Sequence, residues 1–352
     1  MFFSSFFKTH ISQRILIIVK KRTLPFYDQD AGSYKSISSG LKNSAIFTIG
    51  LLTDLGHTAK LVEVIDNNCI NKVVTEFKPD IVIIEALWVI PSKFEILKKI
   101  HPTVNWVVRL HSDTPFLAHE GPAIDWLHGY INQKIFIAVN STKIENELKY
   151  ILPTDSVLPL PNFYPLSNKI PTYQRSSNDL NIGCFGAIRP MKNHLMQAFA
   201  AIKFADTKNL HLNFHINANR CEDKGEPILK NLRALFDNST HSLIEHSWKD
   251  HDQFLILIST MDISMQVSFS ETFNIVSADA VSLNVPVVVS PEIFWVNSLF
   301  QTSPTSSKKI IQALNFAWYS SKIGTQRLNF YGLESYNKQV KNDWIKALTK
   351  LN

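Results

Sequence analysis

Hydrophobic residues recur along the chain in short continuous runs, and between these runs apolar residues recur at the spacing of a helix. A continuous apolar run of strand length is typical of a strand buried on both faces, and helices that alternate with such strands are typical of a parallel sheet. The pattern therefore predicts an α/β protein. The expected strands lie at 14–21, 58–66, 80–87, 104–112 and 134–141, and then at 180–188, 210–218, 242–248, 261–267 and 285–290.

The alternation is interrupted between residues 158 and 180, where Pro, Ser and Asn accumulate. Such a composition is typical of an exposed connection, and a chain of 352 residues is long enough for about two domains. We place the boundary near residue 165 and expect two doubly wound domains, 1–165 and 166–330, followed by a helical segment, 331–352. Ligands of open parallel sheets bind beyond the carboxyl ends of the strands. Candidate residues are therefore sought directly after strands.

Composition narrows the class of protein. The three cysteines, Cys69, Cys184 and Cys221, form no CxxC pair, which excludes a disulfide framework and a thiolate zinc site and favours a reducing, cytoplasmic setting. The best apolar run, 81–90, is about half as long as the ~20 residues that a membrane helix needs. The opening ten residues lack the cleavage site of a signal peptide. We expect a soluble or at most peripheral protein.

The formal net charge of +6 is concentrated at the two ends of the chain. Residues 1–50 contribute +5 and residues 301–352 contribute +6, so the middle is acidic. Solvated surface charge accounts for many such surpluses, and an anionic partner is the alternative.

One segment that follows a predicted strand has the features of a phosphate site. Gly186 permits a tight turn, and Arg189 and Lys192 lie beside the start of a helix, whose N–H groups attract anions. The segment contains neither GxxxxGK[ST] nor GxGxxG. An ATPase P-loop and a dinucleotide-binding fingerprint are therefore not supported.

A second segment, 268–290, places two carboxylates on one expected helix. Glu271 stands near a helix start at Thr272, and Asp279 follows about two helical turns later. A ligand with two hydroxyl-bearing ends would reach both carboxylates. Helix capping by Glu271 and a local ion pair of Asp279 are the simpler alternatives.

This second segment resembles the E-x7-E region of retaining GT-B glycosyltransferases of the glycogen-synthase-like branch, the family 4-like enzymes. Residues 284–290, NVPVVVS, are similar to the G-x-PVV strand of that family. The resemblance covers nearly the whole chain and implies the GT-B fold, with two Rossmann-like domains facing a central cleft and a last helix that crosses back onto the N-terminal domain. It implies transfer of a sugar from a nucleoside diphosphate to an acceptor hydroxyl, with retention and without a metal.

The resemblance also implies roles in donor binding. Glu271 would bind the hydroxyls of the donor sugar, and Asp279 those of the ribose. Arg189 and Lys192 would stabilise the charge that develops on the diphosphate leaving group. His111 matches a family histidine beside the donor sugar. Further donor contacts are expected from Gly186, from the backbone N–H groups of Thr272, Phe273 and Asn274, and, around the base, from Asn217, Arg220 and Trp248.

Three positions depart from the family pattern. Asp279 stands for the second glutamate, Ala187 for the arginine of the phosphate loop, and Asn284 for the glycine before the proline. These departures leave a non-catalytic nucleotide-sugar-binding protein of the same fold as an alternative. No cofactor beyond the donor is implied, and a UDP-sugar is favoured over a GDP-sugar.

The acceptor would lie on the side of the N-terminal domain. Lys20, Lys21 and Arg22 directly follow the first strand, so we hypothesise an anionic acceptor. His119 and Glu120 belong to a segment, DTPFLAHEG, that resembles glycosyltransferases encoded by tailed phages. DNA with a hydroxymethylated base is therefore narrowly favoured over a lipid or envelope polysaccharide at an acidic membrane surface. Gly32 and Ser33 are the nearest match to the Gly-rich loop of the family.

Other classes of site fit the sequence less well. A Ser-His-Asp hydrolase would need a GxSxG elbow, which the chain lacks, and a glycoside hydrolase would need a pair of carboxylates that sequence alone does not bring together. His111, His119 and Glu120 lack the HExxH spacing, so we expect no metal site. We expect no obligate protein partner and a cytoplasmic location, in the host cell if a phage encodes the protein, with peripheral membrane attachment as an alternative.

Overall fold

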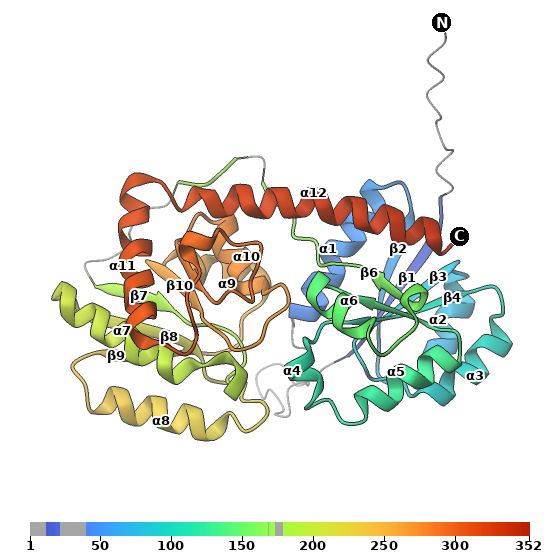
Figure 1. The fold of residues 1–352 in the computed structure, drawn as a ribbon, viewed down its shortest axis with the longest axis horizontal. Coiled ribbons are helices and arrows are strands. Elements are labelled where there is room, and N and C mark those ends of the chain that lie inside the picture. The colour runs from blue at the N-terminus through green and yellow to red at the C-terminus, as the bar shows by residue number, and fades with distance from the viewer. Residues whose placement is uncertain (1–11, 22–39, 168, 173–178) are drawn as a thin grey trace, which may run out of the picture. The chain divides into compact units, whose positions relative to one another are not determined.

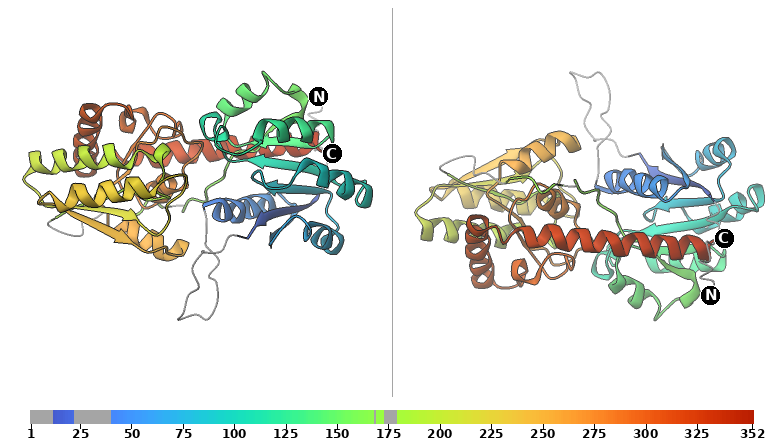
Figure 2. Two further views of the ribbon diagram at one scale, coloured as in Figure 1. Left: turned by 90° about the horizontal axis from the view of Figure 1, so that it is seen from below. Right: turned by 90° about the horizontal axis from the view of Figure 1, so that it is seen from above.

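The computed structural model describes residues 12–21, 40–167, 169–172 and 179–352. The chain divides into two compact units. Unit 1 comprises Met1–Phe163 and Val340–Asn352, and unit 2 comprises Tyr164–Gln339. The long helix α12 (Arg327–Lys350), visible from two sides in Figure 2, therefore begins in unit 2 and ends in unit 1. Among the described residues, no helix combines the length and the hydrophobicity of a membrane-spanning segment.

The described residues of unit 1 form a six-stranded parallel sheet in the order β2-β1-β3-β4-β5-β6 (Figure 1). The order reverses between β1 and β3, as in a doubly wound fold. The strands are β1 (Arg14–Lys20), β2 (Thr58–Val64), β3 (Ile81–Glu85), β4 (Asn105–Leu110), β5 (Phe136–Val139) and β6 (Val157–Pro159). The helices are α1 (Gly40–Asp54), α2 (Ile70–Phe77), α3 (Pro91–Ile100), α4 (Thr114–Leu117), α5 (Ala123–Asn132) and α6 (Thr142–Leu148).

The described residues of unit 2 form a second parallel sheet, with the order β11-β10-β7-β8-β9. Here the order reverses between β7 and β10, which are neighbours in the sheet. The strands are β7 (Leu180–Gly183), β8 (Leu212–Asn217), β9 (Ser242–His246), β10 (Ile263–Gln266) and β11 (Val287–Val289). The helices other than α12 are α7 (His194–Lys208), α8 (Glu226–Asp237), α9 (His251–Ser259), α10 (Ile275–Ser282) and α11 (Ser307–Ile323). Two doubly wound α/β units were predicted, and that prediction is confirmed.

Side chains of unit 1 are sorted onto two faces of the sheet because successive residues of a strand point in opposite directions. On one face, Val82 and Trp106 belong to an apolar cluster with residues of α2, α3, α5 and α6. Glu85 and Arg109 are each an odd number of positions away, so they lie on the other face. Both are charged residues, and both are fully buried among apolar strands. This face therefore contains a charged pair, Glu85 and Arg109, whose burial costs solvation free energy.

The first residues of the segment 158–180, which we expected to be an exposed connection, include buried side chains. Val157–Pro159 form the strand β6, which pairs with β5, and Leu160 and Tyr164 are buried. A proline is tolerated in a sheet at an edge strand, where a missing N–H breaks no ladder bond. Pro159 and the short length of β6 therefore hid this strand from the sequence pattern.

The end of α12 completes the core of unit 1. Trp344 is fully buried, and its Nε1 donates a hydrogen bond of 2.9 Å to the carbonyl oxygen of Pro161. The guanidinium carbon of Arg109 lies 5.4 Å from the centre of the Trp344 ring. Leu348 and Leu351 are buried as well. The last residues thus belong to the buried interior of unit 1.

This packing predicts the effect of replacing Trp344. Trp344→Phe keeps an aromatic ring but removes the N–H donor, which leaves the Pro161 carbonyl unpaired, so we expect the free energy of unfolding to fall by about 1–3 kcal/mol. Urea denaturation followed by circular dichroism measures the change. Lys346→Ala on the exposed side of the same helix is the matched control and should change the free energy by less than about 0.5 kcal/mol. Equal stability of both variants would contradict the buried position of Trp344.

Candidate functional site

The loop that leaves β7 is shaped by a glycine and an asparagine. Gly186 has a φ of +114°, a conformation that other residues rarely adopt. Its N–H donates a hydrogen bond of 3.0 Å to Oδ1 of Asn217, at the end of the neighbouring strand β8. A Cβ at Gly186 would have the side chain of Lys192 as its nearest neighbour, at 4.0 Å. The turn therefore brings the backbone of this loop close to Lys192.

Lys192 and Glu271 form an ion pair between the loops that follow β7 and β10. Nζ of Lys192 donates to Oε1 of Glu271, and the two side chains are 12% and 9% exposed. Burial would raise the pKa of the Glu271 carboxyl, but the Lys192 ammonium and the Arg189 guanidinium hold this pKa below its ordinary value. Glu271 is therefore ionised at neutral pH and is surrounded by two positive charges.

Buried side-chain amides hold these two loops together. Nε2 of Gln197 donates to the Lys192 carbonyl at 2.7 Å, and Oε1 of Gln197 accepts from the N–H of Val267 at 2.9 Å. Asn193, which has a φ of +57°, donates to the Val267 carbonyl at 3.1 Å. The sequence alone did not single out Asn193 or Gln197. The one available signal was an amide at an otherwise apolar helix position, which is weak because such residues are also common on surfaces.

The helix after Glu271 begins later than predicted. We expected a start near Thr272, but α10 begins at Ile275, and Asn274 is its N-cap, with Oδ1 accepting from the Ser277 N–H at 2.8 Å. Asn274 has a φ of +59°, which asparagine tolerates better than most residues. The N–H groups of Thr272, Phe273 and Asn274 therefore precede the helix rather than form its first turn. The side chain of Asn274, and not that of Glu271, therefore caps α10.

Phe273 anchors the segment between Glu271 and α10. Its ring is buried and lies 5.6 Å from the ring of Trp295 and 5.5 Å from that of Tyr336. Nε1 of Trp295 donates to the Phe273 carbonyl at 2.7 Å. Because side chain and backbone are both held, the position of Glu271 next to this anchor is fixed as well.

Asp279 is bound by side chains of its own unit. Its Oδ1 accepts hydrogen bonds of 2.8 Å from the hydroxyl of Tyr164 and from Nε2 of His251. Asp279 is almost completely buried, which raises the pKa of its carboxyl, and the bonds from His251 and Tyr164 offset this only in part. The hydrogen bond to Asp279 in turn raises the pKa of His251. The contact with a neighbouring base, considered as the simpler alternative, is present, and it is an ion pair when His251 is protonated.

Two of the three residues suggested for the nucleotide base, Arg220 and Trp248, are linked by Glu222 to the loop that follows β7. The guanidinium of Arg220 lies 5.2 Å from the centre of the Trp248 ring, and its Nη2 is 2.6 Å from Oε1 of Glu222. Nη1 of Arg189 lies 3.8 Å from Oε2 of the same carboxylate. Glu222, which the sequence analysis did not consider, thus holds both arginines near the carboxyl ends of β7 and β8.

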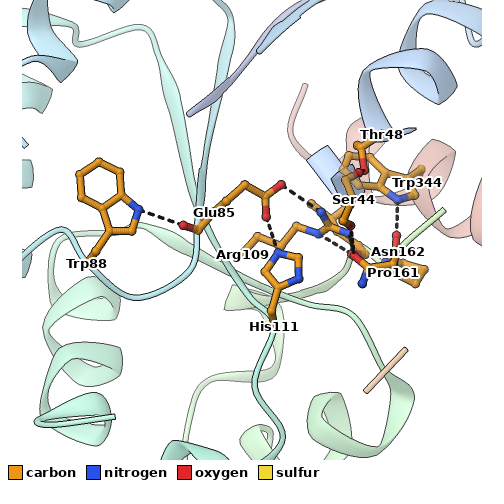
Figure 3. Close-up of polar contacts among 10 residues, drawn as sticks. Ser44, Thr48, Glu85, Trp88, Arg109, His111, Pro161, Asn162 and Trp344 are labelled. Atoms are coloured by element: carbon orange, nitrogen blue, oxygen red, sulfur yellow. Dashed lines mark hydrogen bonds and ion pairs between the residues drawn. The ribbon is translucent and has the colours of Figure 1, made fainter. Parts of the chain in front are cut away.

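Unit 1 contains a separate polar cluster around His111 (Figure 3). Nε2 of His111 is hydrogen-bonded to Oε2 of Glu85, and Oε1 of Glu85 lies 3.0 Å from Nη1 of Arg109. His111 directly follows β4, and Glu85 is the last residue of β3. The sequence alone did not single out Glu85, because a charge within the apolar run 81–90 gives no indication of its partner.

The other residues expected on the acceptor side are surface residues or lie outside the described residues. Lys20 and Lys21 are exposed at the carboxyl end of β1. His119 is exposed, and Glu120 accepts a hydrogen bond of 2.7 Å from Ser112. Arg22, Gly32 and Ser33 lie outside the described residues. Next to His119 and Glu120, an open surface pocket is lined by Leu117, Ala118, Gly121, Pro122, Ala123, Ile124 and Asp125. Within the described ranges no cluster of three His, Cys, Asp or Glu residues could hold a metal ion.

No protein-family model and no curated protein matches this sequence. Solved structures match its fold. The N-terminal domain of Candida albicans trehalose-6-phosphate phosphatase is 12% identical, with a TM-score of 0.65 over 99% of this chain and 98% of that one. A sucrose-phosphate synthase from Thermosynechococcus elongatus is 11% identical, with a TM-score of 0.64 over 96% and 99%. An α-glucosyltransferase in complex with UDP and a 13-mer DNA containing an HMU base is 14% identical, with a TM-score of 0.62 over 95% and 100%. The likeness shows the fold, so the GT-B class predicted from the sequence is confirmed.

The contact between His251 and Asp279 predicts a pH-dependent stability. The folded-state pKa of His251 is raised, so the stabilisation is fully present below the ordinary histidine pKa and is lost as pH rises through the raised value. We expect His251→Ala to lower the free energy of unfolding by about 1–3 kcal/mol at about pH 6 and by clearly less at about pH 9. Urea denaturation at the two pH values measures this difference.

Tyr164→Phe is the matched control for this experiment. It removes the other hydrogen bond to Oδ1 of Asp279 without removing a titrating base, so its cost should be nearly the same at both pH values. A cost of His251→Ala that does not depend on pH would show that the charge of the imidazole contributes nothing.

Proposed function

We propose that this protein is a retaining glycosyltransferase that moves a sugar from a nucleoside diphosphate to an acceptor hydroxyl without a metal. The observation that carries the proposal is the Lys192–Glu271 ion pair, with Arg189 beside it, in the loops that leave β7 and β10. The strand order of the sheet reverses between these two strands, and ligands of open α/β sheets bind beyond the carboxyl ends of the strands at such a point.

The charges of this cluster suit a donor of that chemistry. A diphosphate gains negative charge as its bond to the sugar breaks, and cations fixed in advance stabilise this charge without further reorganisation. Arg189 and Lys192 supply the cations, and the ionised Glu271 accepts hydrogen bonds from sugar hydroxyls. An ammonium has three donors, so Lys192 can bind a phosphate oxygen and keep its contact with Glu271.

The same proposal gives roles to the other unit 2 residues that the sequence suggested for donor binding. Gly186 and the N–H groups of Thr272, Phe273 and Asn274 meet the sugar or the diphosphate, and Asp279 meets the ribose by sharing its carboxylate with Tyr164 and His251. Asn217, Arg220 and Trp248 surround the base. A uridine nucleotide is favoured, because one structural neighbour was solved with UDP and another is a UDP-forming trehalose-phosphate synthase from Burkholderia xenovorans.

For the acceptor we propose DNA with a hydroxymethylated base, which would place the protein in the cytoplasm of a cell. Two observations favour it: the basic surplus at both ends of the chain, and a neighbour of the same fold that was solved with DNA containing an HMU base. Lys20, Lys21 and Arg22 would meet the phosphates, and His119 and Glu120 the region of the acceptor. A lipid or envelope polysaccharide is the second candidate, since the same positive charge binds acidic membrane surfaces.

A donor-by-acceptor screen tests the reaction. UDP- and GDP-sugars are incubated with hydroxymethylated DNA, unmodified DNA and acidic lipid extract, and nucleotide release and product mass are measured. We expect transfer from a UDP-sugar to hydroxymethylated DNA, and Glu271→Gln should lower kcat roughly 10²–10³-fold because it removes a preorganised charge from the site. Glu226→Gln, at an exposed position of the same unit, is the matched control and should keep wild-type activity.

The other outcomes of the screen separate the alternatives. Product on lipid alone would replace DNA as the acceptor but keep the enzyme class. Donor binding with neither transfer to any acceptor nor hydrolysis of the donor would favour a non-catalytic sugar-nucleotide-binding protein. Equal activity of Glu271→Gln and wild type would contradict the proposed site.

The DNA acceptor has a further consequence for salt dependence. Each phosphate neutralised by a lysine or arginine releases counterions, so the apparent affinity for DNA should fall steeply, by about an order of magnitude or more, between about 50 and 200 mM salt. The KM for the nucleotide-sugar in the same assay should change much less. A KM for DNA that is independent of salt would contradict binding through the basic residues.

A further inference from the structure

Unit 1 buries an ion pair that the donor contacts above do not use. The side chains of Arg109 and Glu85 are both completely buried, 3.0 Å apart. Nε of Arg109 also donates to the Leu160 carbonyl at 2.8 Å, its Nη2 donates to Oδ1 of Asn162 at 2.6 Å, and its guanidinium faces the ring of Trp344. Taking two charges out of water is costly, and well-packed apolar residues are often as stable. The pair therefore calls for an explanation other than stability.

The second oxygen of Glu85 points to such an explanation. Oε1 of Glu85 is occupied by Arg109, and Oε2 contacts Nε2 of His111 (Figure 3). Glu85 and Arg109 are paired residues of neighbouring strands, and His111 follows two positions after Arg109. His111 thus lies where the strands end, with a side chain that is 17% exposed, while the two residues behind it are fully buried. Arg109 thus fixes the Glu85 carboxylate, and Glu85 in turn fixes the His111 ring, which reaches the surface.

The charge state of Glu85 decides which nitrogen of His111 carries a proton. Burial would raise the pKa of Glu85, but Arg109 and His111 together lower it, so the carboxyl is ionised and only accepts hydrogen bonds. Nε2 of His111 must then be the donor. Burial and the nearby Arg109 lower the pKa of His111 although Glu85 opposes them, so the ring is neutral at neutral pH. In a neutral imidazole with a proton on Nε2, Nδ1 has the lone pair.

We propose that Glu85 is a positioning residue that holds His111 as the Nε2–H tautomer, so that Nδ1 accepts a hydrogen bond from a hydroxyl of the sugar substrate. Arg109 keeps Glu85 ionised, and Asn162 and Leu160 keep Arg109 in place. This inference rests on the proposed transfer reaction. It adds Glu85 to the residues of the site, and it states the direction of the hydrogen bond: His111 accepts from the sugar and does not donate to it. Without the Glu85 charge, the imidazole would exchange freely between its two tautomers.

The tautomer can be observed without any substrate. Histidine ¹⁵N shifts of the whole chain distinguish a protonated from an unprotonated ring nitrogen, and His111→Asn identifies the signals of His111. In the wild type we expect the Nε2–H form across neutral pH. In Glu85→Gln we expect a mixture of tautomers and a further decrease of the His111 pKa, because the charge of Arg109 is no longer balanced. The same tautomer and pKa in both proteins would overturn the proposal.

Activity tests whether the tautomer matters for the reaction. With the acceptor and donor found in the screen, Glu85→Gln should lower kcat about 10–100-fold and change the KM for the donor by less than about twofold, as for a lost acid–base or hydrogen-bonding contribution. In the His111→Ala background, Glu85→Gln should have no further effect on kcat, because a residue that acts through another is coupled to it. Independent, multiplicative effects of the two changes would overturn the positioning role.

Two controls exclude a general loss of structure. Glu95→Gln changes an exposed carboxylate of α3 that accepts a hydrogen bond from Gln133, and it should leave kcat and the ¹⁵N shifts unchanged. The urea midpoint of Glu85→Gln and a plot of kcat against pH are measured in parallel. A change confined to stability, with a wild-type pH profile, would assign Glu85 a purely structural role and overturn the inference.

The two proposals fail in different ways. If the wild type transfers no sugar from any donor, the transfer reaction and the role of Glu85 in it are both wrong, whereas the ¹⁵N measurement still decides whether Glu85 sets the tautomer. If the wild type is active but Glu85→Gln is uncoupled from His111→Ala, only the inference about Glu85 fails.

Discussion

The Lys192–Glu271 ion pair joins two loops that leave neighbouring strands of one parallel sheet, and the local structure of unit 2 is arranged around it. Gly186 turns the first loop, Gln197 ties it to the second, and the buried Phe273 anchors the chain just after Glu271. Because neighbouring parallel strands end at the same edge of a sheet, residues about eighty positions apart meet there. A fixed pair of opposite charges at such an edge is suited to a ligand that carries both phosphates and hydroxyls.

The sequence predicted the alternation of strands and helices well, because completely apolar strands such as β1 and β3 leave little ambiguity. It also singled out Lys192 and Glu271, because both follow a predicted strand and lie beside the expected start of a helix, whose N–H groups attract anions. It did not predict β6, where Pro159 conceals an edge strand, or the start of α10, where Asn274 takes a left-handed conformation. Glu85 and Arg109 were missed for another reason: a charge within an apolar run becomes meaningful only when its partner on the next strand is known.

Unit 1 and unit 2 use buried carboxylates in opposite ways. Glu85 is held by an arginine and is ionised, whereas Asp279 is held by a tyrosine and a histidine, and its pKa is raised. The difference follows from the partner, because a guanidinium keeps its charge at all accessible pH values and an imidazole does not. The environment of Asp279 is thus sensitive to pH near neutrality, whereas the ion pair between Glu85 and Arg109 is not. A pH profile of this protein therefore reports on unit 2 and His111 rather than on the Arg109 pair.

The position of Trp344 in the core of unit 1 has a consequence for the way in which the chain folds during synthesis. Domains commonly fold as units while the ribosome is still adding residues, and the N-terminal one folds first. Unit 1 cannot do so completely, because Trp344, Leu348 and Leu351 belong to its core and are made after the whole of unit 2. Until then Arg109 lacks the aromatic ring that faces it, and part of the sheet is uncovered. The emerging chain therefore presents, during the synthesis of unit 2, the apolar surface that these three residues later cover.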